Sequence, residues 1–302
     1  MRMLGLHTIF MGLTVATVAL GVRNGMERLV KLLMPTLFIL LVYMAVFAAS
    51  TSGFEAGLHY LFYPDWSKLS AEAVMVAMGQ AFFSLSLGMG ALMAYGAYLP
   101  KNASIFKVSA SIAMVDMLVA ILAGLVIFPL VFTYELEVGS GPGLIFITLP
   151  IAFGQFSHGQ VIGTCFFSLL LFAAWTSAIS LLEPAVTWLI ENRQISRTKA
   201  ACIMGLLIWT VGIGTVLSFN LWENYQLFGK TFFDILEYVS SNVMLPMGGL
   251  LIAFFTAWKM SKKSMSEELA SGDRFFRIWS WIIAYVAPVG VLLIFLHAIK
   301  VV

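Results

Sequence analysis

The stretch that most constrains the fold runs from Gly79 to Gly90, inside an apolar run over residues 71–99. A helix needs roughly 20 residues to cross a bilayer, so this run is long enough to span with a break inside it. Serines compete for backbone hydrogen bonds, and glycines tolerate left-handed backbone. Backbone that unwinds at membrane depth must be buried in protein or line a wet cavity. The sequence therefore predicts a helix that breaks between Phe83 and Gly90, with a binding site at the break.

Composition favours a polytopic membrane protein, since 61% of the 302 residues are hydrophobic and 11% are charged. The expected fold is all-α. A segment over residues 144–153 is too short to span and is expected to be interfacial or to dip into the membrane. Residues 51–70 are expected to form a polar loop, and Lys259–Arg274 is expected to be a charged linker. Eight apolar segments are expected to span, at about 6–22, 28–50, 71–99, 106–132, 160–190, 199–218, 232–259 and 275–299.

The distribution of basic residues predicts the orientation. Of the 17 Lys and Arg residues, all except Arg2, Lys68, Lys230 and Lys300 fall in alternate loops on one side. The positive-inside rule makes that side cytoplasmic. Loops that contain Arg23 and Arg193 are thus expected inside, and Glu135 outside.

Four stretches resemble a known family. In chain order they closely resemble the neurotransmitter:sodium symporters, whose bacterial members carry amino acids, and the first is similar to that family's broken sixth helix. The resemblance implies one membrane domain over residues 1–302 with a partial LeuT-type inverted-repeat fold. It also implies that the chain matches helices four to eleven, so that the family's first three helices are not in it. The stretches are Gln80-Ala-Phe-Phe-Ser-Leu-Ser-Leu-Gly-Met-Gly90 with Tyr95-Gly-Ala-Tyr98, Gly143-Leu-Ile-Phe-Ile-Thr-Leu-Pro150, Trp175-Thr-Ser-Ala-Ile-Ser-Leu-Leu-Glu-Pro184 and Ser241-Asn-Val-Met-Leu-Pro-Met-Gly-Gly-Leu250.

The resemblance implies two sodium sites. Ser84 and Asp116 match the first site, where the family usually carries an asparagine at the position of Asp116. A carboxylate oxygen is a hard ligand that suits sodium, while the alternative is a protonated aspartate hydrogen-bonded between helices. Ala173, Thr176 and Ser177 match the second site, although Ser and Thr in membrane helices often bond back to the preceding turn.

The same resemblance implies a substrate pocket and gates. Phe83 is expected to close over the substrate as a lid. Glu183 lies deeper in its apolar run and needs a partner, which the sequence does not identify. The expected pocket residues are Phe83, Ser84, Ser86, Met89, Ser177 and Leu181, and the expected gate residues are Tyr98, Glu191 and Asp234.

The function implied by the resemblance is sodium-coupled symport of an amino acid or related small amine across the cytoplasmic membrane. The expected partners are the lipid bilayer, sodium ions and the amino-acid substrate, and N-terminal helices from another chain are a further candidate. No organic cofactor or nucleic acid is expected. The alternative is a non-transporting remnant, or a scaffold that pairs with other membrane helices. An enzyme is disfavoured because no His-Glu-x-x-His or Gly-x-Ser-x-Gly motif is present.

Overall fold

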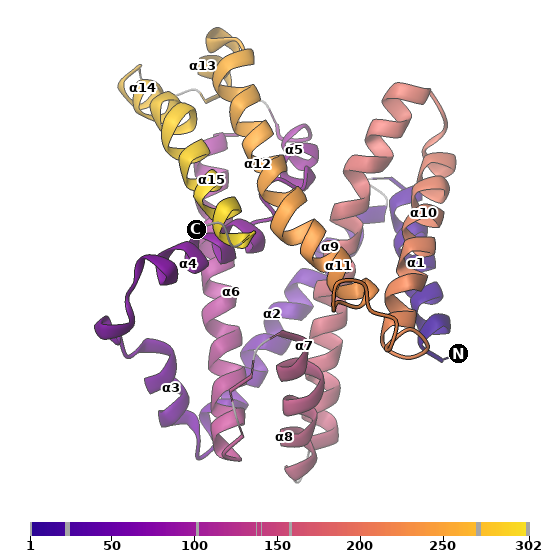
Figure 1. Ribbon diagram of the computed structural model, residues 1–302, viewed down its shortest axis with the longest axis vertical. Helices are drawn as coiled ribbons and strands as arrows, with labels where there is room; N and C mark the ends of the chain where they lie inside the picture. The colour runs from indigo at the N-terminus through magenta and orange to yellow at the C-terminus, as the bar shows by residue number, and fades with distance from the viewer. Residues whose placement is uncertain are drawn as a thin grey trace. The chain divides into compact units, whose positions relative to one another are not determined.

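The computed structural model describes residues 2–21, 25–100, 103–136, 138–139, 141–156, 159–269 and 273–299. Within these residues the chain is helical and has no β-strand, and one isolated bridge joins Leu227 to Lys230. The elements, shown in Figure 1, are α1 (Arg2–Ala19), α2 (Glu27–Ala49), α3 (Phe54–Phe62), η2 (Trp66–Lys68), α4 (Ala71–Ser84), α5 (Ala91–Gly96), α6 (Ile105–Thr133), α7 (Gly141–Gly143), η3 (Leu144–Thr148), α8 (Leu149–Gln155), α9 (Gly159–Arg193), α10 (Arg197–Ser218), α11 (Phe232–Glu237), η4 (Tyr238–Met244), α12 (Leu245–Phe254), η5 (Phe255–Lys259), α13 (Lys262–Leu269), α14 (Asp273–Trp281), η6 (Ile282–Val286) and α15 (Ala287–Ala298).

Seven helical stretches in the described residues are long and apolar enough to cross a membrane. They agree with seven of the expected segments and confirm a multi-pass, all-α membrane protein. The remaining expected segment, over residues 71–99, is divided between the shorter helices α4 and α5. Whether these two helices together make an eighth crossing stays a prediction.

The chain divides into two compact units. Unit 1 comprises Met1–Gly21, Leu69–Ala113 and Ile179–Val302, and unit 2 comprises Val22–Lys68 and Met114–Ala178. Helices α6 and α9 contribute residues to both units.

The core of unit 2 joins α2, α6, α8 and α9. Leu130 of α6, Leu149 of α8 and Met44 of α2 are fully buried in it, and Phe166 of α9 is buried beside them. The segment over residues 144–153 is therefore helical, through η3 and α8, and contributes Leu149 and Phe153 to this core. Its depth in the bilayer stays a prediction.

Residues 51–70, expected to be a polar loop, contain α3 and η2 instead. α3 approaches α6 closely because a Cβ on Gly57 would lie 2.7 Å from the backbone nitrogen of Pro129. The hydroxyl of Thr133 accepts a hydrogen bond from the N–H of Gly53 at 3.1 Å and donates one to the carbonyl of Pro129 at 2.7 Å. The expectation was wrong because these contacts join residues far apart in the sequence. The linker Lys259–Arg274 likewise contains α13, whose Met265 and Leu269 are buried.

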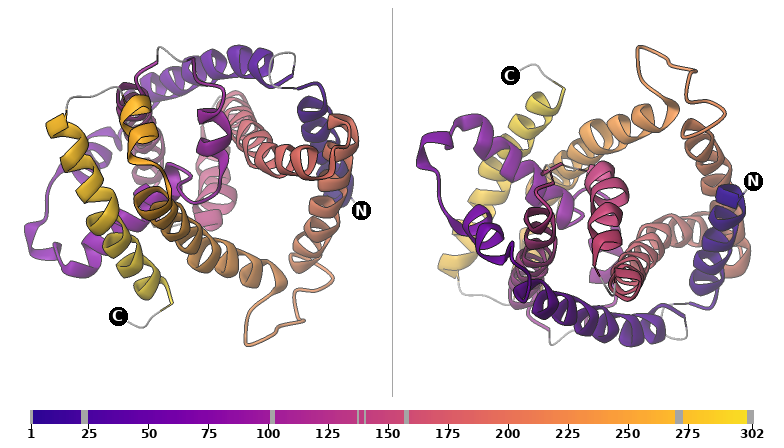
Figure 2. Two further views of the ribbon diagram at one scale, coloured as in Figure 1. Left: turned by 90° about the horizontal axis from the view of Figure 1, so that it is seen from above. Right: turned by 90° about the horizontal axis from the view of Figure 1, so that it is seen from below.

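In unit 1, α1 packs along α10, as Figures 1 and 2 both show. Small residues on α10 allow the approach: a Cβ on Gly205 would lie 2.2 Å from Val15, and one on Gly212 would lie 2.5 Å from the ring of His7. A second cluster in the same unit joins α4, α12 and α15. Its buried members are Phe82, Leu245, Val291 and Ile294.

Candidate functional site

The predicted break in residues 71–99 is present, because α4 ends at Ser84 and α5 begins at Ala91. The N–H of Ser86 bonds to the carbonyl of Phe83 at 2.9 Å, and the N–H of Leu87 bonds to that of Phe82 at 3.1 Å. This pair of bonds is a Schellman cap, which satisfies carbonyls at the end of a helix. The helix therefore ends in a defined turn.

Ser86 occupies the left-handed position of this cap, with a φ of 53°. Glycine usually fills that position, because a Cβ there is strained. Leu87 packs against the cluster that contains Phe82, the hydrophobic contact that commonly accompanies such a cap. Ser86, expected to line the pocket, thus also shapes the backbone of the break.

The break is held against the start of α12. A Cβ on Gly88 would lie 2.3 Å from the carbonyl oxygen of Leu245 and 2.8 Å from the nitrogen of Gly249. A Cβ on Gly248 would in turn lie 2.4 Å from the carbonyl oxygen of Gly88. Two of the four motifs noted in the sequence therefore meet backbone to backbone, and only glycine permits that approach.

The expected pocket residues around the break differ in exposure. Phe83, expected to be a lid, is 49% exposed, whereas the adjacent Phe82 is buried against Gly249. Met89 packs against the cluster of Phe82, and Leu181 on α9 is exposed.

Two residues that were not among the predicted site residues join α5 to α9. They are Tyr95 and Ser180, whose hydroxyl oxygens lie 2.7 Å apart.

The expected ligands of the second sodium site lie on one stretch of α9. The hydroxyl of Thr176 donates to the carbonyls of Ala173, at 3.0 Å, and Phe172, at 3.1 Å. The structure thus brings Thr176 and the Ala173 carbonyl together. The bond between them runs from the hydroxyl to the preceding turn of the same helix, which is the alternative to ion binding noted in the sequence. The side chain of Ser177 is exposed.

The two residues expected to form the first sodium site belong to different units. Asp116 is half-buried on α6 in unit 2, and Ser84 is the last residue of α4 in unit 1. The Ser84 hydroxyl is 3.4 Å from the carbonyl of Ala81. The pairing of Asp116 with Ser84 stays a prediction. No group of three or more His, Cys, Asp and Glu side chains with metal-site geometry occurs in the described residues, so a cation site here would rest on hydroxyl, carbonyl and carboxylate oxygens.

The three expected gate residues have different surroundings. Asp234 forms a capping box with Thr231 at the start of α11: its Oδ2 accepts bonds from the Thr231 N–H at 2.9 Å and hydroxyl at 2.7 Å. Such a box fixes the beginning of a helix. Glu191 is exposed in the last turn of α9, and Tyr98 is exposed just after α5. Their roles as gates stay predictions.

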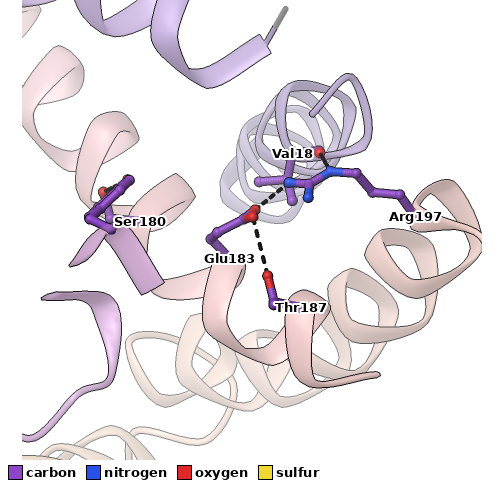
Figure 3. Close-up of polar contacts among 6 residues, drawn as sticks. Val18, Ser180, Glu183, Thr187 and Arg197 are labelled. Carbon is purple, nitrogen blue, oxygen red and sulfur yellow. Dashed lines mark hydrogen bonds and ion pairs between the residues drawn. The ribbon is translucent and has the colours of Figure 1, made fainter. Parts of the chain in front are cut away.

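The partner of Glu183 is Arg197. Glu183 is fully buried in α9, and the guanidinium of Arg197 at the start of α10 donates to its Oε2. Figure 3 shows the carboxylate between Arg197 and Thr187, whose hydroxyl donates to Oε1 at 3.3 Å. Arg197 Nε also donates to the carbonyl of Val18 in α1 at 2.8 Å. One arginine therefore joins α1, α9 and α10, and gives the buried carboxylate the partner that it requires.

Known proteins similar to this chain belong to the family that its sequence motifs resemble. The profile of the Sodium:neurotransmitter symporter family matches residues 4–302. An uncharacterized sodium-dependent transporter of Bacillus subtilis, YhdH, is 38% identical over 300 residues, which cover 98% of this chain and 66% of that protein. One from Haemophilus influenzae is 36% identical over 281 residues, 92% of this chain and 61% of that protein. The crystal structure of MhsT in complex with L-phenylalanine matches with a TM-score of 0.86 and 39% identity, covering 96% of this chain and 67% of that one. The chain thus spans about two thirds of the length of these relatives.

Proposed function

The chain belongs to the sodium:neurotransmitter symporter family, and on that basis we propose that it serves sodium-coupled symport of an amino acid or related small amine. Its helices make it a multi-pass membrane protein, and the relatives are named as transporters and not as enzymes. The cytoplasmic membrane is the location that this function requires.

The observation that carries the proposal is the break between α4 and α5. Discontinuous helices at membrane depth place freed carbonyls and helix ends around a substrate and its coupling ions. Here the break is a capped turn with positive φ at Ser86, Gly88 and Gly90, fixed on α12. This arrangement supports a preformed site and argues against a helix that has merely frayed.

Sodium would be held by oxygen ligands. Thr176, Ser177 and the carbonyl of Ala173 would form one ligand set, and Ser84 with Asp116 would contribute to another. Hydroxyls, carbonyls and carboxylates are the ligands that hard cations prefer. The Thr176 hydroxyl can bind a cation through its oxygen lone pairs while its proton is donated in a hydrogen bond to the Ala173 carbonyl.

The substrate would lie beside the turn of residues 85–90. Phe83, Ser86, Met89 and Leu181 would line its side-chain end, and the break would present backbone groups to its polar end. The solved relative holds L-phenylalanine. An apolar or aromatic amino acid is accordingly the substrate class to test first.

The test is uptake of radiolabelled amino acids by cells that express the native gene, compared in sodium and potassium buffers. We expect accumulation of L-phenylalanine or another apolar amino acid to be severalfold higher in sodium, and to exceed that of cells with an empty vector. Equal accumulation in the two buffers, for every amino acid tested, would overturn the proposal.

A further inference from the structure

A hollow of about 420 Å³ lies in unit 1, where η5, α13, α14 and η6 meet. It shares no residue with the break or with the expected sodium sites. Two of its walls, η5 and η6, are π-helical turns that contact each other, and π-helical turns frequently occur at functional sites. Its lining includes Trp258, Lys262, Trp279, Ser280, Trp281 and Tyr285.

The lining is rich in aromatic rings and lies near the ends of two candidate spans, Phe232–Lys259 and Arg274–Ala298. Trp258, Trp279, Trp281 and Tyr285 contribute to it, and amphipathic rings of this kind gather at the headgroup level of bilayers. The adjoining linker Lys259–Arg274 is expected on the cytoplasmic side from its basic residues. With that orientation, we expect the hollow to face the glycerol and headgroup of an inner-leaflet lipid.

Ser280 supplies an unused hydrogen-bonding group. Its Oγ is buried, and no donor or acceptor among the described residues bonds to it. A buried hydroxyl without a partner is unfavourable. A ligand in the hollow that carries an acceptor oxygen would give this hydroxyl a partner once its side chain turns toward the hollow.

Lys262 gives the hollow its charge. Among the lining residues that the structure describes, it is the charged one, and none of them is acidic. The adjacent Lys263 differs, because it lies 4.0 Å from Glu267 in an exposed pair and does not line the hollow. A cation beside a hydroxyl without a partner and aromatic rings is complementary to an anionic phospholipid headgroup.

We propose that this hollow binds an anionic phospholipid of the cytoplasmic leaflet. Lys262 contacts the phosphate, the Ser280 hydroxyl turns into the hollow and donates to a phosphate or ester oxygen, and Trp258 and Trp281 pack against the glycerol and the first methylene groups. The proposal is independent of the transport function, since none of these residues belongs to the site described above.

The experiment titrates the purified full chain in detergent with phosphatidylglycerol or phosphatidylcholine and counts bound lipid by native mass spectrometry. The variants are Lys262→Gln and Ser280→Ala. Their matched controls are Lys263→Gln and Ser264→Ala, on α13 but outside the lining. Thermal unfolding without added lipid shows whether each variant is folded. Soluble glycerol phosphate is the competitor that separates a lipid site from a free-phosphate site.

We expect phosphatidylglycerol to bind in preference to phosphatidylcholine and Lys262→Gln to weaken it about fivefold, the effect of one basic residue at an anionic membrane surface. Ser280→Ala should weaken it while leaving unfolding without lipid unchanged or raised, because an unpaired buried hydroxyl is removed. Lys263→Gln and Ser264→Ala should change binding less than about twofold. Equal effects of Lys262→Gln and Lys263→Gln, equal binding of the two lipids, or displacement by millimolar glycerol phosphate would each overturn the proposal.

Discussion

Arg197 and Glu183 form an ion pair in which the glutamate side chain is fully buried and the arginine side chain is 25% exposed. Replacing Arg197 by Met should lower the free energy of unfolding by about 3–5 kcal/mol, because it strands a buried carboxylate. The double variant Glu183→Leu with Arg197→Met should regain most of that loss, since no charge is left without a partner. Unfolding in mixed detergent micelles measures both. Arg193→Met, in the exposed last turn of α9, is the control, and an equal loss in Arg193→Met and Arg197→Met would show that the pair does not stabilise the fold.

The two left-handed glycines of the break should differ in their tolerance of alanine. Gly90→Ala introduces strain of roughly 1–2 kcal/mol at positive φ, and its Cβ would meet Pro184 only at an ordinary 3.6 Å. Gly88→Ala adds an overlap with the Leu245 carbonyl oxygen at 2.3 Å, so we expect at least about 3 kcal/mol from strain and overpacking together. The same unfolding measurement compares them. Similar losses would contradict the close contact between the break and α12.

Asp116 should matter more to sodium dependence than Ser84. Asp116→Asn should raise the sodium concentration for half-maximal uptake about tenfold or more, since interactions with a charged group are worth about 1.5–3 kcal/mol. Ser84→Ala removes a neutral ligand and should have the smaller effect. Uptake is measured over a range of sodium concentrations in cells that express the native gene. Asp65→Asn, in an exposed loop, is the control, and undiminished uptake by Asp116→Asn would remove Asp116 from the mechanism.

Thr176 can be tested against a threonine in the same local setting. Thr176 and Thr164 both lie on α9, and each hydroxyl donates to a carbonyl four residues earlier. Thr176→Val should weaken sodium dependence about fivefold or more, in line with loss of one oxygen ligand worth about 1 kcal/mol, while Thr164→Val should leave it unchanged. If both variants retain wild-type sodium dependence, the Thr176 hydroxyl serves only the helix.

The orientation can be tested with single cysteines at positions 193 and 135. Cys165 and the exposed Cys202 are free thiols, so both are first replaced by alanine. In intact cells an impermeant maleimide should label position 135 and not position 193, because basic loops remain cytoplasmic. Labelling at 193 and protection at 135 would show the opposite orientation.

Sequence reasoning located the broken helix because its cause is local. The Ser and Gly content of residues 84–90 and the length of the apolar run indicate a break without any knowledge of the rest of the chain. The partner of the break was not predictable in the same way. Gly88 packs against Gly248 and Gly249 through backbone atoms. No pattern of side chains in the sequence therefore indicates this contact.

The charged pair shows a similar limit. A buried carboxylate requires a partner, so the sequence indicated that Glu183 had one. Arg197 was counted only among the basic residues that set orientation, because its position near a helix start is typical of a cytoplasmic loop. Its reach to Glu183 depends on how α9 and α10 pack, and that packing is a tertiary property.

The bond from Arg197 to the carbonyl of Val18 also has a consequence for biosynthesis. The two residues are 179 positions apart, and ribosomes add about 5–20 residues per second. The end of α1 therefore remains without this partner for roughly 10–35 s after it is made. During that interval α1 also lacks the surface of α10 on which it packs, so lipid or the insertion machinery must shelter it until α10 emerges.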